Sequence, residues 1–515
     1  MNGPQSLPNP AFMTAKPTMR ASASKFLEEL FYQLVLPLTF ALIVLFFFPS
    51  RANFQFSFDE GVNLMKSMLM GKGYHLYAEI WSDQPPLFSY ILTKVIDLTG
   101  NSVAPGRLLV LVFSCLLLWA AIQFMRLSWG NSTALIGAIL IFFLPRYLIL
   151  SYSVMIGLPA ISLAMLSLLF QAYWHYKRKW VWLVLSAILL ALSVLTKLFT
   201  GILAPLFLAG LLMHEVHGSR DKTWFRVITP ALVWGCIFGV LGASLGLWLV
   251  GFQNLPQLLE PHLAATSAVQ FDQPEFTLSW YLRGVIPILI LAAIGTVFAI
   301  QEKKWISLYL SGWSVFAYLS LFRHTPIWEH HLLLITIPAA MLAAIATFML
   351  FHLIVNLVST NLKLNFTNML LAISLAAFIM YFFPFAIRDP LNLLSPIPSI
   401  SAEDLGLGPT HDQTLRIAFK YAPRSKWMVT DLPMVAYRAG VLVPPNLAVF
   451  TAKRYASGFI TQEDLIDAVK EYQPEQVLLG RYEYPLVDSF LVSNGYHLVH
   501  QADLDKLYIR KDLLR

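Results

Sequence analysis

Residues 31–49 read FYQLVLPLTFALIVLFFFP, and the acidic segment FDEG at 58–61 follows shortly after this apolar run. A bilayer-spanning helix needs about 20 mainly apolar residues, so the run predicts a membrane span. The residues before it are fairly polar, and the run lacks a small-residue cleavage site, which favours an uncleaved signal anchor. We therefore expect residues 1–30 to form a flexible cytoplasmic tail.

The same apolar pattern continues along most of the chain. Of its 515 residues, 57% are hydrophobic and 13% are charged, whereas a soluble protein carries about 25% charged residues. This composition excludes a soluble enzyme with one anchor, a disordered chain and a disulfide-stapled domain. Ten further runs predict spans at about 106–125, 132–149, 153–174, 180–196, 198–213, 228–251, 281–300, 305–321, 330–352 and 368–386. We expect an all-α polytopic bundle of about 11 transmembrane helices over residues 31–386.

The positions of the basic residues predict the orientation of the bundle. With the N-terminus inside, the basic stretches 175–179, 220–226 and 303–304 all fall on the cytoplasmic side, as cytoplasmic loops require. The outer side then holds the loop 50–105, the loop 252–279 and everything after about residue 386. Because the charges are spread between spans, the net charge of +7 indicates membrane lipids as partners, and no nucleic acid.

The composition changes abruptly after the last apolar run, and residues 387–515 read as a soluble α/β domain. Short strands are predicted at 426–430 and 476–480, and the end of the chain suggests a hairpin at 497–499 and 507–509. A helix is predicted at about 462–472, with Thr461 as its N-cap. No phosphate-binding glycine loop occurs in this region, so we expect a lid or recognition domain on the outer face.

The outer loop 50–105 carries the densest group of polar motifs. After FDEG at 58–61, apolar residues recur at helical spacing from Val62 to Met70, which predicts an interfacial helix. Pro85 and Pro86 then end one element and begin the next. Because the loop starts at the end of a span, its acids are expected at the membrane surface, where a lipid-linked substrate presents its reactive bond.

These motifs resemble the GT-C class of membrane glycosyltransferases, in particular the protein O-mannosyltransferase and aminoarabinose (lipid A) transferase families. The resemblance rests on the acidic pair 59–60 and on GKGYHLY at 71–77, SDQPP at 82–86, Arg107, LTK at 195–197 and EHHLL at 329–333. It implies a GT-C-like fold and a hexosyl or pentosyl transferase of a bacterial inner membrane, with its active site facing outward. The implied partners are a polyprenyl-phosphate sugar donor and a lipid, glycan or protein acceptor.

The resemblance and elementary chemistry together indicate which carboxylates are catalytic. Transfer from a phosphate to a hydroxyl or amine requires a base, whereas the phosphate leaves as a stable anion without a second acid. Asp59 is the candidate base, and attack opposite the phosphate would invert the sugar. Glu60 is expected to orient Asp59 or the acceptor. The alternatives are a solvated helix N-cap for Asp59 and an ordinary first-turn acid for Glu60.

The leaving phosphate needs positive charge, and several basic residues lie near outer span ends. Arg323 is our first choice, although each of these residues is also explained by a snorkelling anchor. Asp83 matches the acid of the Pro-Pro segment that helps to hold a divalent metal in aminoarabinose transferases, whereas Gln84 replaces the lysine common there. We expect no required cofactor, with a metal at Asp83 as the alternative. The candidate substrate- or phosphate-binding residues are Asp83, Arg107, Lys197, Arg323, His324 and His330, the last with its neighbour His331.

Two other functions compete with a transferase. A transporter or lipid flippase also has many spans, but it places carboxylates at the membrane midplane and shows inverted repeats. Here the spans are nearly free of acids and no inverted repeat is visible. A structural membrane protein would leave the acids of the first outer loop without a role.

Overall fold

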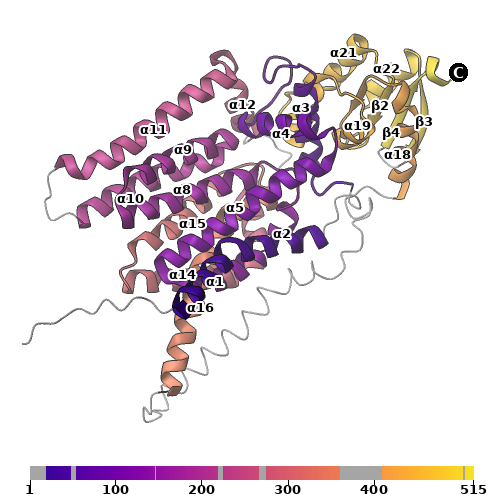
Figure 1. Ribbon diagram of the computed structural model, residues 1–515. Helices are drawn as coiled ribbons and strands as arrows, with labels where there is room; N and C mark the ends of the chain where they lie inside the picture. Colours follow the sequence, from indigo (N-terminus) through magenta and orange to yellow (C-terminus); the bar gives the residue numbers. More distant parts are fainter. Residues whose placement is uncertain are drawn as a thin grey trace, which may run out of the picture.

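The protein is described by a computed structural model. It consists of a bundle of long helices with a small mixed domain against one end (Figure 1). The residues that the structure describes are 19–47, 54–144, 146–218, 224–265, 274–359, 409–502 and 505–514.

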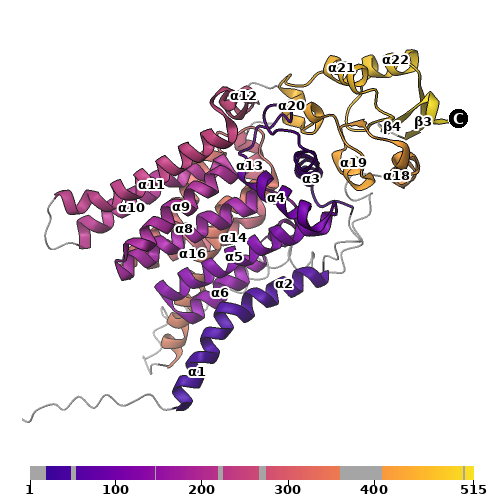
Figure 2. The same cartoon turned by 45° about the horizontal axis from the view of Figure 1, so that its top comes forward.

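The bundle contains eleven α-helices within the described residues, and most run roughly side by side (Figures 1 and 2). They are α1 (Met19–Leu30), α2 (Leu36–Phe47), α5 (Val103–Trp129), α6 (Asn131–Phe142), α8 (Gly157–Lys177), α9 (Trp180–Thr196), α10 (Leu203–Gly218), α11 (Trp224–Val250), α14 (Ile286–Gln301), α15 (Leu308–Leu321) and α16 (Leu333–Ser359).

The predicted apolar runs correspond to these helices. Seven described segments are long and apolar enough to cross a membrane: Ser24–Phe46, Val103–Trp129, Gly157–Lys177, Leu198–Val216, Trp224–Val250, Pro274–Gln301 and Glu329–Val355. Three shorter apolar helices, Asn131–Phe142, Trp180–Thr196 and Trp305–Leu321, match further predicted runs. The run 368–386 lies outside the described residues. The helix predicted at 132–149 ends earlier, at Phe142, because Pro145 disfavours helical backbone just before it.

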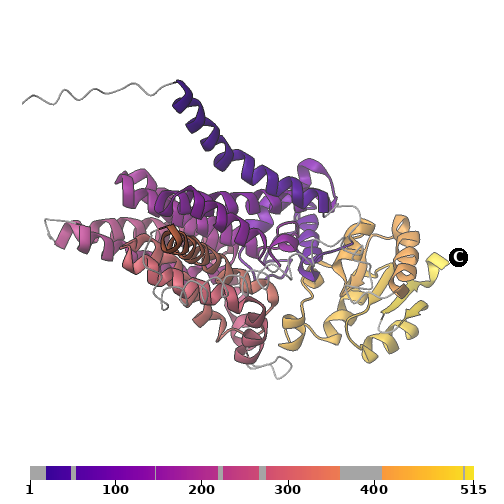
Figure 3. The ribbon, with the colours of Figure 1, turned by 90° about the horizontal axis from the view of Figure 1, so that it is seen from below.

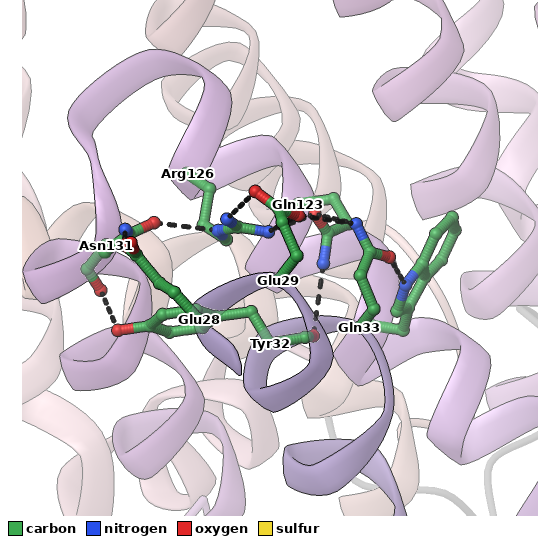
Figure 4. A network of polar contacts seen from close by, with 8 residues as sticks. Glu28, Glu29, Tyr32, Gln33, Gln123, Arg126 and Asn131 are labelled. Atoms are coloured by element: carbon green, nitrogen blue, oxygen red, sulfur yellow. Dashed lines mark hydrogen bonds and ion pairs between the residues drawn. The ribbon is translucent and has the colours of Figure 1, made fainter. Parts of the chain in front are cut away.

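The first helix begins before its predicted start. It is continuous from α1 through the π-helical turn Phe31–Val35 into α2, so the prediction of a flexible tail up to residue 30 is wrong at its end. A polar network explains this extension (Figure 4): Arg126 of α5 pairs with Glu29 at 2.7 Å and donates to Asn131 at 2.8 Å. Gln33 joins it by donating to Gln123 at 3.1 Å. These partners satisfy side chains that an apolar span would leave unpaired.

The helices of the two outer loops lie at the end of the bundle that faces the small domain (Figures 1 and 2). The first loop folds into α3 (Phe58–Gly71) and α4 (Leu87–Thr99), as the helical spacing and the proline pair predicted. The second contains α12 (Leu255–Ala265) and α13 (Pro274–Leu282), which continues into the α14 span.

The small domain is built on a four-stranded sheet with the order β1-β2-β4-β3. The strands are β1 (Met428–Thr430), β2 (Gln476–Leu479), β3 (Tyr496–Ala502) and β4 (Asp505–Arg510), and its helices are α18 (Pro409–Tyr421), α19 (Pro433–Ala439), α20 (Ala452–Ala456), α21 (Gln462–Tyr472) and α22 (Pro485–Ser493). β1 and β2 are parallel, and β3 and β4 form the predicted antiparallel hairpin. The predicted Thr461 cap of α21 is confirmed, because its hydroxyl accepts from the Asp464 amide.

The two parts of the protein are joined through α3. One continuous apolar core runs from Leu64 of α3 and Leu92 of α4 to Val435 of α19 and Val477 of β2. Every residue of α3 from Glu60 to Leu69 is buried. The helix therefore differs from the expected interfacial helix with one exposed face, because the small domain covers the side that would otherwise face water.

The backbones of the two parts approach each other closely at Gly61. A Cβ atom on Gly61 would lie 2.6 Å from the backbone nitrogen of Met434, the second residue of α19. Nearby, Tyr437 donates a hydrogen bond to the Ser102 carbonyl at 3.2 Å, and Arg438 donates to the Phe54 carbonyl at 2.6 Å. The absence of a side chain at residue 61 thus permits the docking of the small domain.

We predict that Gly61→Ala loosens this docking, because two backbones must separate to accommodate the new methyl group. The expected loss is about 1–3 kcal/mol of stability, as for other overpacked sites. It would be measured by thermal unfolding in detergent and by proteolytic release of the small domain. Gly239→Ala is the matched control, since a Cβ atom there meets nothing within 4 Å. Identical melting and proteolysis of the two variants would contradict the proposed contact.

Candidate active site

A buried ion pair fixes the first turn of α3. Arg107 of α5 donates from Nε and Nη2 to the two carboxylate oxygens of Glu60, each at 2.8 Å. Glu60 also accepts from the backbone amides of Phe56 at 3.1 Å and Val154 at 3.2 Å. Both charged side chains are 0% exposed. The pair therefore ties three distant segments together, and its groups face each other rather than a substrate.

Asp59 adjoins this pair but has different surroundings. Ser57 occupies the N-cap of α3, and Asp59 lies in the first helical turn. Asp59 is only partly buried. The alternative of a solvated N-cap for Asp59 is therefore wrong, because the helix begins one residue before it.

Positive charges surround the Asp59 carboxylate. Burial and the Asp83 carboxylate raise the pKa of Asp59, whereas the cations of Lys197, Arg481 and Lys66 oppose this rise. Lys66 lies on α3 itself and is 1% exposed. Burial lowers the pKa of Lys66 to about 8, although Asp83 and Asp59 favour its charged form. Asp59 is thus a carboxylate held in a confined, cationic environment, which suits a proton acceptor.

Arg481 reaches this region from the small domain. Its guanidinium carbon lies 3.7 Å from the centre of the Phe58 ring. The buried Asp431, at the end of β1, accepts hydrogen bonds from the amides of Gly480 and Arg481 and from the Tyr484 hydroxyl. The segment TDLP at 430–433, which contains Asp431, thereby positions a cation beside α3.

Asp83 is the centre of a second junction between the parts. Lys453 of α20 forms an ion pair with its carboxylate. The ring of His262 on α12 places Nε2 3.2 Å from the Asp83 carbonyl oxygen and 3.9 Å from its carboxylate. Burial alone would raise the pKa of Asp83, but Lys453 and His262 lower it to about 2. The residue is therefore ionised throughout the neutral pH range.

Lys197 interacts electrostatically with both carboxylates. The charges of Asp59 and Asp83 favour the charged form of Lys197, whereas the cation of Lys453 disfavours it. Its Nζ is 3.7 Å from the position of a Cβ on Gly157, the first residue of α8. Lys197 therefore lies beside the N-terminal end of α8.

The histidines lie beside these lysines. The ring centres of His324 and His331 are 5.3 Å apart, those of His330 and His331 are 4.5 Å apart, and His324 is 6.3 Å from His262. Burial lowers the pKa of His324 to about 4. His324 is therefore neutral at pH 7 and offers an N–H donor rather than a positive charge. We name Asp59, Lys66, Asp83, Lys197, His262, His324, His330, Lys453 and Arg481 together the polar cluster.

Two predicted residues lie apart from the polar cluster. Arg323 is exposed, and its guanidinium forms no ion pair with a described residue. Glu329, which belonged to the histidine-rich motif, pairs with Arg146. No contact therefore supports Arg323, our first choice, as the phosphate ligand. Its side chain is directed to the surface, whereas the lysines of the polar cluster lie beside Asp59 and Asp83.

The side chains present do not fit a metal centre. Within the described ranges, no group of three or more His, Cys, Asp or Glu side chains is arranged to hold an ion. The carboxylate of Asp83 already has an ammonium group as its partner, and a metal cation would have to displace it. We therefore derive no catalytic step through a metal.

Sequence reasoning missed three cations of the polar cluster. Lys66 lies within an apolar helical pattern, and Lys453 and Arg481 lie 394 and 422 residues from Asp59 along the chain. The signal available for Lys66 was a lysine within an otherwise apolar run. No local pattern distinguishes Lys453 or Arg481 from the other basic residues of a soluble domain.

Comparisons with known proteins agree with this architecture. The family model for dolichyl-phosphate-mannose-protein mannosyltransferase matches residues 83–241. This segment includes Asp83, Arg107 and Lys197. A sequence search among curated proteins finds no match.

Solved structures show the fold along almost the whole chain. ArnT from Cupriavidus metallidurans bound to undecaprenyl phosphate has a TM-score of 0.59 at 14% identity, with 92% of this chain and 97% of that chain covered. Archaeal oligosaccharyltransferase AglB from Archaeoglobus fulgidus, in complex with an inhibitory peptide and a dolichol-phosphate, has a TM-score of 0.53 at 12% identity, with 91% and 73% covered. The expected GT-C-like fold is confirmed.

The Asp83 junction predicts how stability depends on pH. The folded pKa of Asp83, about 2, is below the ordinary value of about 3.9. The ionised carboxylate therefore contributes about 2 kcal/mol above pH 5, which is lost as the pH falls from about 5 to about 2. We expect the stability difference between the unmodified protein and Asp83→Asn to narrow by about 1 kcal/mol from pH 6 to pH 3 in thermal unfolding.

Asp467→Asn provides the control for this measurement. Asp467 belongs to an exposed pair with Lys470, and such pairs contribute little to stability. The stability difference between Asp467→Asn and the unmodified protein should stay constant between the two pH values. If the stability difference between the unmodified protein and Asp83→Asn is equally constant, the junction does not lower the pKa of the Asp83 carboxylate.

Proposed function

We propose that the protein is a membrane glycosyltransferase that moves a sugar from a polyprenyl-phosphate donor to a hydroxyl or amine of a lipid, glycan or protein acceptor. The observation that carries this proposal is the placement of the Asp59 carboxylate, which forms no ion pair within the described residues, at the end of a GT-C-like bundle where the charges of two lysines act on it. A hexosyl or pentosyl donor fits this chemistry. Further support comes from the relative ArnT, whose structure was solved with undecaprenyl phosphate bound.

In the proposed reaction, Asp59 takes the proton from the acceptor hydroxyl or amine. The acceptor atom forms a bond to C1 of the sugar as the bond between C1 and the phosphate oxygen breaks. Polyprenyl phosphate leaves with the electron pair of that bond, and attack from the opposite face inverts the anomeric centre. Glu60 and Arg107 act as positioning residues, because their ion pair holds the turn that carries Asp59.

Developing negative charge on the leaving phosphate requires nearby cations. Lys197 is the membrane-domain residue best placed for this task. It adjoins the first residue of α8, and the N-terminal end of a helix also favours an anion. Neutral histidines such as His324 add N–H donors to the same region. We propose that these groups stabilise the leaving phosphate without the divalent metal that the resemblance allowed as an alternative.

The distribution of charge favours a transferase over a carrier. In the described segments that are long and apolar enough to cross a membrane, the carboxylates are Glu28, Glu29, Glu215, Glu275 and Glu329. All of them lie close to a segment end. A carrier is expected to keep ionisable groups near the membrane midplane, whereas here the acids and lysines of the polar cluster gather at the end that bears the small domain. We propose that this end faces outward across a bacterial inner membrane.

The proposed base is tested by Asp59→Asn, which keeps the shape of the side chain but removes its ability to accept a proton. We expect turnover to fall by about 10² to 10⁴ without loss of stability. Purified protein would be incubated with a panel of polyprenyl-phosphate sugars and membrane extract, and the products would be identified by mass spectrometry.

Asp97→Asn serves as the control because Asp97 lies in the same outer loop and forms only a partly exposed pair with Lys94 at 3.9 Å. This variant should keep its activity. If Asp59→Asn retained more than half of the activity under conditions where chemistry limits turnover, another group would have to be the base.

The proposed absence of a catalytic metal predicts that turnover survives chelation. A chelator followed by dialysis should leave the rate unchanged, since lysines rather than an ion neutralise the phosphate. The rate would be measured before and after treatment and after addition of divalent ions. Loss of turnover that a divalent ion reverses, and that is absent in Asp83→Ala, would instead assign a metal to Asp83.

A further inference from the structure

We infer that Lys453, on α20 of the small domain, binds the phosphate of the lipid-linked donor, so that this domain supplies part of the donor site. The inference rests on the proposed function and adds to it a binding residue from outside the helical bundle. The expectation of a lid without chemistry is thereby replaced by a domain that contributes a cation.

Lys453 is held in a defined orientation by two partners. Its ammonium group pairs with the Asp83 carboxylate and lies 3.3 Å from Nδ1 of His262. Because an ammonium group can only donate, Nδ1 must be the acceptor and the proton of the neutral ring is on Nε2. That proton is then directed at the Asp83 carbonyl oxygen, 3.2 Å away. Lys453, His262 and Asp83 thus form a closed set of mutually consistent hydrogen bonds.

This arrangement leaves Lys453 with unused donor capacity. An ammonium group has three N–H donors, and two of them serve Asp83 and His262 within the described part of the chain. The side chain is 12% exposed, so its third donor is not sealed in the core. A phosphate oxygen is a suitable acceptor for it, since charge-assisted bonds of this kind are among the strongest that a protein forms.

The backbone that carries Lys453 is rigid. The Thr451 hydroxyl caps α20 by accepting from the Arg454 amide. The guanidinium of Arg454 donates to the carbonyl oxygens of Asn446 and Val449, and its carbon lies 4.2 Å from the centre of the Trp81 ring in the first outer loop. The loop that contains Asp83 and the helix that contains Lys453 are therefore fixed against each other before any ligand arrives.

Electrostatics explains why the arrangement suits an anion. Lys453 and Lys197 come from different parts of the protein, and the positive charge of Lys453 disfavours the charged form of Lys197, whereas Asp59 and Asp83 favour it. Asp83 is paired directly with Lys453. A phosphate group that carries one to two negative charges would add a partner for both ammonium groups, because opposite charges at short range favour each other strongly in a partly buried site. If Lys453 and Asp83 formed only a structural ion pair, the nearby Lys197 would have no role in it.

The test compares two ligands that differ only in the phosphate group, undecaprenyl phosphate and the uncharged undecaprenol, on the purified full-length protein. Binding would be measured by native mass spectrometry or by ligand-dependent thermal shift. The unmodified protein should prefer the phosphate. If it shows no such preference, the proposed function itself fails. If the preference exists, the variants decide whether Lys453 produces it.

For Lys453→Gln we expect phosphate binding to weaken by about 10- to 100-fold, the effect of losing one hydrogen bond to a charged group. Binding of undecaprenol should be unchanged, which a general loss of structure would not allow. Lys453→Arg should retain most of the preference. Lys470→Gln is the matched control, since it removes a lysine from the same domain at an exposed pair.

A second variant covers the case in which Lys453→Gln destabilises the protein by leaving Asp83 unpaired. The double variant Lys453→Gln with Asp83→Asn replaces the ion pair by two neutral groups that can still bond, so it should fold. It should also show the reduced preference for phosphate. Full retention of that preference in a folded Lys453→Gln protein or in the double variant would overturn the inference.

Discussion

The buried pair between Glu60 and Arg107 is the interaction on which the rest of the site depends. A fully desolvated carboxylate is stable only when its acceptor positions are filled, and Glu60 meets this demand with Arg107 and two backbone amides. Removing one partner of such a pair costs about 3–5 kcal/mol. The pair thereby fixes the first turn of α3 to α5 and to the chain at residue 154. Its neighbour Asp59 thereby has a defined place, and within the described residues it forms no hydrogen bond or ion pair of its own.

The helix held by this pair is also the surface on which the small domain docks. Gly61 admits the backbone of α19, and the burial of α3 on all sides makes the two parts share one core. Seen from below the bundle, the sheet domain lies beyond its end rather than along its side (Figure 3). This placement brings Arg481 and Lys453 to the acids of the first outer loop. The positive charge around Asp59 and Asp83 thus comes from both parts, and neither part alone contains the whole polar cluster.

Individual residues show where prediction from sequence succeeded. The apolar runs, the helix after FDEG, the helix after the proline pair and the Thr461 cap all depend on interactions within a few residues, and the structure contains each of them. Lys197 and Asp83 were placed near the reactive region by resemblance, and both belong to the polar cluster. Arg323 was favoured on the same grounds, yet it is exposed. Proximity to the end of a span does not specify the direction of a side chain.

The sequence by itself determined that the chain is a polytopic membrane protein with an acidic loop after its first span and a mixed C-terminal domain, because composition and periodicity report burial along a single segment. Only the tertiary structure decided that Glu60 is satisfied by Arg107, that Asp83 is paired with Lys453 and that Lys66 is buried where the charges of Asp59 and Asp83 act on it. Each of these relations joins residues whose separation in sequence carries no information about their distance in space. A charge shows its role only when its partners are known, because the same lysine is a surface anchor in water and a binding group beside a buried carboxylate.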